Sequence, residues 1–262
     1  MYRTHDDILL GRRQRVLECA SGVRLIQATY APGTRFPPHA HDRGNVSLIV
    51  RGQIEEIVGR VTVSAATCDV VVKPAGTVHG NRFGPDGART LVVEIPISFR
   101  ALGRWRWIHG GPVAASALRV YRAMRSDEVV DLDELVTELI ADIEDELSAP
   151  TAAMAPPWVR RVRDVIHDSF PHPVSVAQLA RSVDVHPVYL ARAFRARFGC
   201  AVTQYVRRLR VRAAAHRLAC SSAPVCDVAL AMGFADQAHL TRVFKRDTGV
   251  TPARFRRLTQ AN

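Results

Sequence analysis

Three histidines in the first third of the chain have the residue type and spacing of a metal site. His39 and His41 lie two positions apart, so on a β-strand both side chains point to the same face. A neighbouring strand that carries His79 would bring a third imidazole beside them. Three imidazoles inside a small β-structure can hold a divalent metal ion. The same three side chains could instead line a pocket without metal.

A second candidate chemistry, hydrogen bonding to DNA, lies near the C-terminus. Gly233 ends one short helix, and the Asp236 carboxylate caps the amides at the start of the next. On that next helix Leu240, Val243 and Phe244 form an apolar stripe at helical spacing. The opposite face suits a DNA groove and comprises Gln237, Ala238, Thr241, Arg242, Lys245 and Arg246.

The same helical unit occurs fifty residues earlier in the chain. Leu190-x-Arg192-x-Phe194 followed by Gly199 reappears as Leu240-x-Arg242-x-Phe244 followed by Gly249. In the earlier copy, Ser175 and Gln178 form a capping box, and Pro187 lies where the second helix begins. The sequence therefore predicts two helix-turn-helix units in tandem.

These motifs resemble the signature of AraC/XylS-type transcriptional regulators. The resemblance covers residues 158–262, and residues 202–219 match the linker helix of that family. Its most specific part is the run Gly233-Phe234-x-Asp236-Gln237-x-His239-Leu240-x-Arg242-x-Phe244-Lys245-x-x-x-Gly249-x-Thr251-Pro252-x-x-Phe255-Arg256. His186 stands where the family more often has a serine cap. The resemblance implies that the earlier recognition helix contacts DNA through Val188, Ala191, Arg192 and Arg195.

The charge distribution agrees with a DNA partner for the C-terminal part. From Trp158 onward the chain has 18 basic and 6 acidic residues, a net charge of +12. Residues 1–157 have 18 basic and 19 acidic residues, a net charge of −1. A basic excess confined to one domain is typical of a protein that binds a polyanion.

Residues 1–100 have the pattern of short β-strands. The expected strands are rich in β-branched residues and are separated by Pro-Gly, Arg-Gly, Val-Gly and Asp-Gly turns. Many short strands at close spacing predict a barrel or sandwich. The expected strands are 23–30, 46–50, 54–58, 60–64, 70–72 and 90–95.

This region also resembles the cupin motifs. The first motif is Gly33-x5-His39-x-His41-x3-Asn45-x6-Gly52, with Asn45 in place of the motif's glutamate, and the second is Pro74-x-Gly76-x2-His79. Without that glutamate the histidines lack a charge-neutralising ligand, so we expect a small-molecule pocket and no resident cofactor. The candidate ligand-binding residues are Arg35, His39, His41, Asn45, Arg51 and His79.

Helices connect the two regions. Residues 104–107, Arg-Trp-Arg-Trp, are expected to pack over the barrel. Residues 112–124 and 132–147 have helical patterns, and the apolar stripe of the second suits a dimer seam, a lid on the barrel, or packing within one subunit. Residues 148–157, with Ala-Pro-Thr and Pro-Pro, have the composition of a linker.

The predicted fold is therefore α+β: a cupin-like β-barrel (1–110), a helical connector (111–155), and an all-α double helix-turn-helix domain (156–262). Five cysteines without C-x-x-C spacing predict no disulfide framework and no thiolate zinc site. We expect a cytoplasmic protein without a signal peptide, membrane span or enzymatic activity.

The predicted function is transcriptional regulation by a one-component protein that senses a small molecule. Its expected partners are double-stranded DNA, the effector, RNA polymerase if it activates, and a second copy of the chain. The alternative is a cupin-type metal-dependent enzyme or metal sensor with an attached DNA-binding domain. A third class, an architectural DNA-binding protein, leaves the N-terminal domain unexplained.

Overall fold

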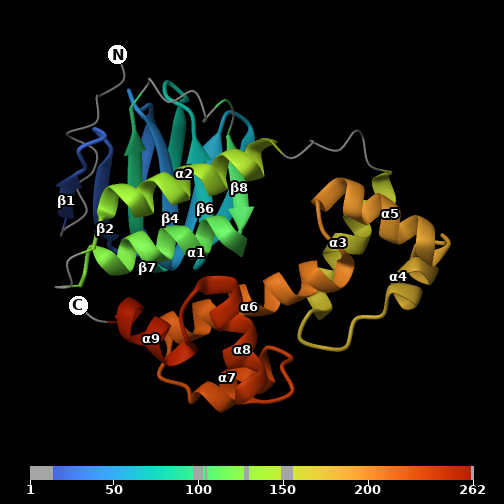
Figure 1. The fold of residues 1–262 in the computed structure, drawn as a ribbon. Coiled ribbons are helices and arrows are strands. Elements are labelled where there is room, and N and C mark those ends of the chain that lie inside the picture. The colour runs from blue at the N-terminus through green and yellow to red at the C-terminus, as the bar shows by residue number, and fades with distance from the viewer. Residues whose placement is uncertain (1–13, 97–102, 104, 127–129, 149–155, 261–262) are drawn as a thin grey trace.

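The chain folds into a β-sheet domain, two covering helices and a helical C-terminal region (Figure 1). The computed structural model describes residues 14–96, 103, 105–126, 130–148 and 156–260. The fold class is α+β, as the sequence predicted. No helix among these residues is both long and apolar enough to cross a membrane.

Eight strands form one antiparallel sheet. Their order is β1-β2-β7-β4-β6-β8, while β3 pairs with β7 and β5 pairs with β4. The strands are β1 (Gln14–Glu18), β2 (Arg24–Tyr30), β3 (Arg35–His39), β4 (Gly44–Val58), β5 (Val61–Ala66), β6 (Asp69–Lys73), β7 (His79–Ile95) and β8 (Arg106–His109). The expected cupin-like barrel is not closed among the described strands, because the edge strands β1 and β8 each pair with one neighbour only.

Two dipeptides that the sequence analysis took for turns lie inside long strands. Arg51-Gly52 lies inside β4 and Asp86-Gly87 inside β7, where each marks a bend. Gly52 and Gly87 have φ angles of 87° and 67°, a region that favours glycine. A Cβ atom on Gly52 would lie 2.1 Å from the carbonyl oxygen of Gly87, so the two strands cross in direct backbone contact. Each strand can therefore pair with different partners at its two ends.

Helices α1 (Gly111–Ala123) and α2 (Leu132–Ser148) cover one face of the sheet. The apolar stripe of α2 is buried inside this chain, at Val136, Leu139, Ile140 and Ile143, where it joins the core formed by α1 and the sheet. Of the three expected roles for this stripe, the structure places it in packing within one subunit.

The C-terminal region contains two similar helical units joined by one long helix. The first comprises α3 (Pro157–Ser169), α4 (Val176–Ser182) and α5 (Pro187–Phe198), and the second α7 (Val225–Ala231), α8 (Gln237–Thr248) and α9 (Pro252–Gln260). Helix α6 (Val202–Cys220) contributes its first half to the core of the first unit and its second half to the core of the second. The tandem predicted from the fifty-residue repeat is therefore present.

Arg210 on α6 holds the two units together. Its guanidinium donates hydrogen bonds to the carbonyl oxygens of Phe170 (2.7 Å) and His172 (2.9 Å), which follow α3. It also donates to the carbonyl oxygen of Gly233 (2.7 Å), in the turn before α8. One side chain thus fixes the loops of both units against their shared helix.

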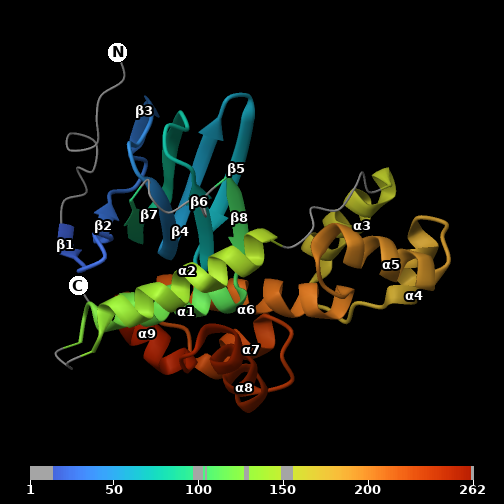
Figure 2. The ribbon, with the colours of Figure 1, turned by 45° about the horizontal axis from the view of Figure 1, so that its top comes forward.

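The second unit also packs on the covering helices. Figure 2 shows α1 and α2 between the sheet and the α7–α8 pair. Buried side chains of α1, such as Ala117 and Leu118, belong to the same apolar core as Leu240 and Phe244 of α8. The sheet, the covering helices and the second unit therefore share one core.

We expect two glycine substitutions to differ sharply in their effect on stability. Gly233 and Gly249 have φ angles of 78° and 75°. A Cβ atom at Gly249 meets nothing within 4 Å, whereas one at Gly233 would lie 2.2 Å from the carbonyl oxygen of Pro171. Gly249→Ala should lower the free energy of unfolding by roughly 1–2 kcal/mol, from backbone strain alone. Gly233→Ala should lower it by roughly 3 kcal/mol or more, because steric overlap is added. Equal losses in urea unfolding would contradict the close approach.

Candidate DNA-binding surface and sensor cavity

Helix α8 presents the polar face that the sequence predicted. Asp236 caps it, since the Asp236 carboxylate accepts a hydrogen bond of 2.6 Å from the backbone amide of His239. Leu240, Val243 and Phe244 are buried in the domain core. The other face is accessible: Gln237, Ala238, Arg242, Lys245 and Arg246 are exposed, and Thr241 is half-buried.

Helix α5 repeats this arrangement with a different cap. His186 Nδ1 accepts a 3.3 Å hydrogen bond from the amide of Val188, so an imidazole performs the role of the serine common in the family. Leu190 and Phe194 are buried. All four predicted contact residues are exposed: Val188, Ala191, Arg192 and Arg195.

Tyr189 is a surface residue that the sequence analysis missed. It is 52% exposed beside Val188, and its ring centroid lies 5.6 Å from that of Trp158. An aromatic side chain in this position adds a flat apolar surface to the face of α5 that carries the predicted contacts. The available signal was its position three residues before Arg192, which places the two side chains on one helix face.

The two exposed faces are held at a fixed separation by α6. Its nineteen residues give it a length of about 28 Å. This length is close to one turn of B-DNA, which separates successive major-groove segments on one face by about 34 Å. The geometry suits two recognition helices that read neighbouring grooves.

A second site, a small cavity, lies inside the sheet domain. Its volume is about 40 Å³, enough for a few water molecules or a very small ligand. Its wall is formed by Tyr30, Phe36, His39, His41, Asn45, Ser47, Ile54, Glu56, Lys73, Asn81, Phe83, Thr90 and Val92.

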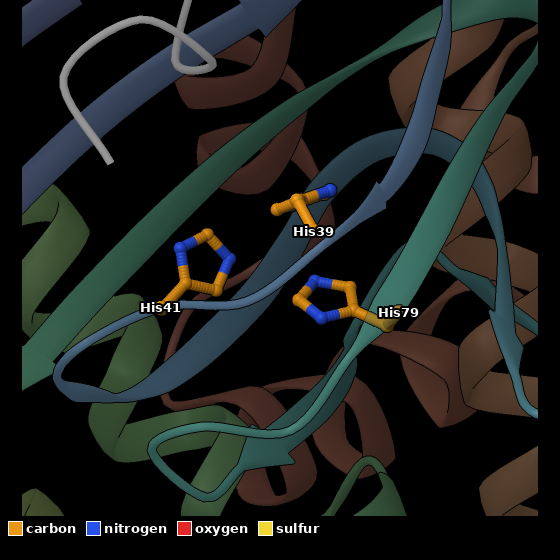
Figure 3. A group of neighbouring side chains, drawn as sticks. All are labelled: His39, His41 and His79. Carbon is orange, nitrogen blue, oxygen red and sulfur yellow. The ribbon is translucent and has the colours of Figure 1, made fainter. Parts of the chain in front are cut away.

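The three histidines face one another beside this cavity, which His39 and His41 line (Figure 3). His39, at the end of β3, pairs in register with His79 at the start of β7, so an opposing strand does bring His79 beside it. His41 follows the end of β3, so the expectation that both His39 and His41 lie on one strand is wrong. Ring centroids are 4.4 Å apart for His39 and His79, and 5.0 Å apart for His41 and each of the other two. One nitrogen atom from each ring lies within 4.8 Å of the other two.

The hydrogen bonds of two rings fix which nitrogen keeps a free lone pair. His39 Nδ1 lies 2.8 Å from the carbonyl oxygen of Pro37, and His79 Nδ1 lies 3.1 Å from that of Thr77. A carbonyl oxygen can only accept, so each Nδ1 carries the proton and each Nε2 of a neutral ring keeps its lone pair. His79 Nε2 is buried and has no hydrogen-bond partner among the described residues.

The electrostatic environment keeps these rings neutral. Burial lowers the pKa of His39. Burial, together with the positive charge of Lys73, lowers the pKa of His79 to about 3. Neutral imidazoles with free Nε2 lone pairs can bind a metal ion or accept hydrogen bonds from a ligand.

A buried ion pair, which the sequence analysis also missed, lines the cavity. Lys73 Nζ lies 2.6 Å from Glu56 Oε1, and Asn81 Nδ2 donates to the same oxygen at 3.2 Å. Glu56 Oε2 has no partner among the described residues. The available signal was that Glu56 lies two residues after the apolar Ile54 on an expected strand, because residues two apart share one face of a sheet.

Three predicted ligand residues do not line the cavity: Arg35, Arg51 and His79, of which only His79 lies beside it, in the histidine cluster. Arg35 lies on the exposed side of β3, whereas the next residue of the strand, Phe36, is half-buried. Arg51 lies at the bend of β4, where the strand register shifts, and is not part of the cavity wall. Asn45 is buried and lines the cavity, as expected.

The tryptophan segment packs on the sheet domain, as expected. Arg106 and Trp107 belong to β8, and Trp105 and Trp107 pack against the apolar cluster around Tyr30 and Phe83. Arg104 lies outside the described residues. The Trp105 ring lies 5.0 Å from that of His79, so it covers one side of the histidine cluster.

The chain is similar to known transcription regulators over its C-terminal part. A helix-turn-helix domain family matches residues 179–258. The chain is 29% identical over 103 residues to the bifunctional transcriptional activator/DNA repair enzyme AdaA of Bacillus subtilis, covering 39% of this chain and 49% of that protein. It is 30% identical over 114 residues to the arabinose operon regulatory protein of Escherichia coli, covering 42% of this chain and 39% of that protein.

Among solved structures, the C-terminal domain of AraT, a response regulator from Geobacillus stearothermophilus, is 27% identical with a TM-score of 0.40. The match covers 42% of this chain and 92% of that one. The chain spans about half or less of the length of these two curated relatives. Residues 179–258 form a helix-turn-helix domain of the AraC type, as the motifs predicted.

We expect removal of the Lys73 ammonium to destabilise the sheet domain strongly. Lys73→Met leaves the Glu56 carboxylate buried without its cation, which should lower the free energy of unfolding by about 3–5 kcal/mol. The double variant Lys73→Met with Glu56→Gln should recover most of this loss, because the uncompensated charge is gone. Chemical denaturation of the single and double variants measures the coupling. Additive losses would show that the two side chains do not interact.

Proposed function

We propose that this protein is a one-component transcriptional regulator that binds promoter DNA through α5 and α8. The observation that carries this proposal is the pair of capped helices with exposed polar faces, set on one rigid helix in a domain of net charge +12. The AraC-type domain match at residues 179–258 supports it. Arg192, Gln237 and Arg242 would read base edges, and the remaining cations would contact phosphates.

The sheet domain would be the sensor. Its cavity combines the His39 and His41 imidazoles, the Asn45 amide and a buried ion pair, with His79 beside them, a set of donors and acceptors suited to a small polar effector. The cavity volume of about 40 Å³ limits a ligand that fits without rearrangement to a few heavy atoms. RNA polymerase would be a partner if the protein activates, and a homodimer would need a surface other than the buried stripe of α2.

A metal sensor is the second candidate. The observation that favours it is the convergence of three imidazoles, two of which donate Nδ1–H to backbone carbonyls, as metal-binding histidines commonly do. His39, His41 and His79 would be the ligands. An enzymatic role for the same cluster would leave the tandem helix-turn-helix units without a function, so we propose no catalytic activity.

Base reading and phosphate contact can be separated by two substitutions on α8. Arg242→Ala should cost roughly 1–3 kcal/mol of binding free energy and relax the base preference in one of two boxes about ten base pairs apart. Lys245→Ala should weaken binding to all sequences alike and lower the slope of log affinity against log salt by roughly 0.9. Binding-site selection and salt titration with the full chain measure both effects.

Arg60→Ala, in the exposed β4–β5 turn far along the chain from α8, is the charge-matched control and should change neither quantity. The assignment of α8 fails if Arg242→Ala leaves the selected sequence unaltered. The tandem arrangement fails if one chain protects only a single box in footprinting.

We expect the histidine cluster to be needed for sensing and dispensable for DNA binding. Replacing His39, His41 and His79 together by asparagine keeps polar side chains of smaller size in the cavity. The variant should lose any change in promoter occupancy caused by divalent metals or small polar metabolites, while its affinity for DNA without effector stays within about twofold. Reporter expression with and without effector, beside DNA-binding isotherms, tests this. An undiminished response in the variant would place the sensor elsewhere.

A further inference from the structure

A second group of metal-ligating side chains lies where the sheet domain meets α6. Asp86 of β7 and His216 and Cys220 of α6 each offer one ligand atom, and these atoms all lie within 4.8 Å of one another. This group shares no residue with the histidine cluster of the cavity. None of its three residues belongs to the proposed DNA-binding surface or lines the cavity.

The secondary structure places these three side chains together. His216 and Cys220 are four residues apart on α6, so they lie on the same helix face, with 3.9 Å between His216 Nδ1 and Cys220 Sγ. Asp86 directly precedes Gly87 at the bend of β7. A Cβ atom on Gly87 would lie 2.3 Å from the carbonyl oxygen of Tyr30, so this bend is fixed by close backbone packing.

The distances are close to those of a coordinated metal. Zinc bonds of about 2.0–2.3 Å in tetrahedral geometry separate neighbouring ligand atoms by about 3.4–3.7 Å. The His216–Cys220 pair is already within a few tenths of an ångström of this value, and since Asp86 lies within 4.8 Å of both, it must approach by about 1.4 Å at most. A thiolate, an imidazole and a carboxylate form a donor set that suits Zn²⁺ and similar borderline cations.

The surroundings also suit a cation. Arg212 lies one helical turn before His216, but its guanidinium is 2.6 Å from the buried Asp69 carboxylate, which offsets its charge. Burial lowers the pKa of His216, so its imidazole is neutral and available as a ligand at neutral pH. The buried Thr67 hydroxyl lies 3.5 Å from His216 Nδ1 and provides a polar neighbour.

We propose that Asp86, His216 and Cys220 form a binding site for a zinc-class divalent cation that fastens the sheet domain to α6. Three protein ligands leave a fourth position for water. Because α6 carries both helix-turn-helix units, a cation here fixes the orientation of the sheet domain relative to the DNA-binding surface. The site is independent of the proposed role of the cavity, and its occupancy can be measured without DNA or effector.

The experiment is a Zn²⁺ competition titration of the full chain in which His39, His41 and His79 are already replaced by asparagine. This background removes the other histidine cluster. We expect one equivalent of Zn²⁺ to bind, and Cys220→Ser, His216→Ala and Asp86→Asn each to lower the affinity at least about tenfold. Cys226→Ser, which changes an exposed cysteine on α7, is the matched control and should leave the affinity unchanged. Co²⁺ should give a thiolate charge-transfer band that Cys220→Ser abolishes.

A second measurement uses the unsubstituted chain and so does not depend on whether any variant folds. Zn²⁺ should slow the alkylation of Cys220 by iodoacetamide and leave the rate at Cys226 unchanged. The site would be overturned if the Cys220→Ser and His216→Ala variants kept the Zn²⁺ affinity of the background chain, or if Zn²⁺ did not protect Cys220 from alkylation. An unchanged affinity in Asp86→Asn alone would overturn the bridge between the sheet and α6.

Discussion

The buried carboxylate of Asp69 is the interaction on which the arrangement of the two halves depends. Asp69 is fully buried, and a buried charge is costly unless it is paired and hydrogen-bonded. Its partners come from three elements: Arg212 of α6 at 2.6 Å, His109 of β8 at 3.0 Å, and the backbone amide of Ala66 at 2.7 Å. If α6 moved off the sheet, Arg212 would leave and the carboxylate would lose its guanidinium partner. Docking of the helix-turn-helix region onto the sheet is therefore part of what makes burial of this charge tolerable.

Helix α6 contacts both the sheet and the loops of the helix-turn-helix units, because two of its arginines lie on opposite faces of the helix. Arg210 and Arg212 are two positions apart, which on a helix places them about 200° apart around the axis. Arg212 binds the sheet through Asp69, while Arg210 binds the carbonyl oxygens of the loops in both helix-turn-helix units. The same rigid element thus contacts the proposed sensor and sets the spacing of the proposed recognition helices. A shift of α6 against the sheet would therefore move both α5 and α8, because both of their units pack on this helix.

The sequence predicted the features that depend on local signals and missed those that depend on distant partners. Caps such as Asp236 and the stop at Gly233 act within a few residues, and the fifty-residue repeat is visible in the sequence itself. Both helix-turn-helix units were therefore predicted correctly. The sequence allowed an opposing strand to bring His79 beside His39, as it does, but strand alternation misplaced His41, which lies beyond the end of β3. The bends at Gly52 and Gly87 look like turns locally, because the close backbone contact that demands glycine comes from another strand. Asp69 with Arg212, and Glu56 with Lys73, are paired across long sequence distances that composition and spacing do not show.

Charge balance distinguishes the two clusters that could hold a cation. Burial lowers the pKa of His39 and of His79, and the Glu56 carboxylate is already matched by Lys73, so a divalent ion would bring two uncompensated charges into a buried site. Metal there would require an anionic co-ligand or separation of the ion pair, which agrees better with a small polar or anionic effector than with a resident ion. At the junction with α6, a thiolate and a carboxylate supply two negative charges that neutralise a divalent cation. The cavity is thus the better candidate for a sensor of small molecules, and the Asp86, His216 and Cys220 cluster the better candidate for a metal site.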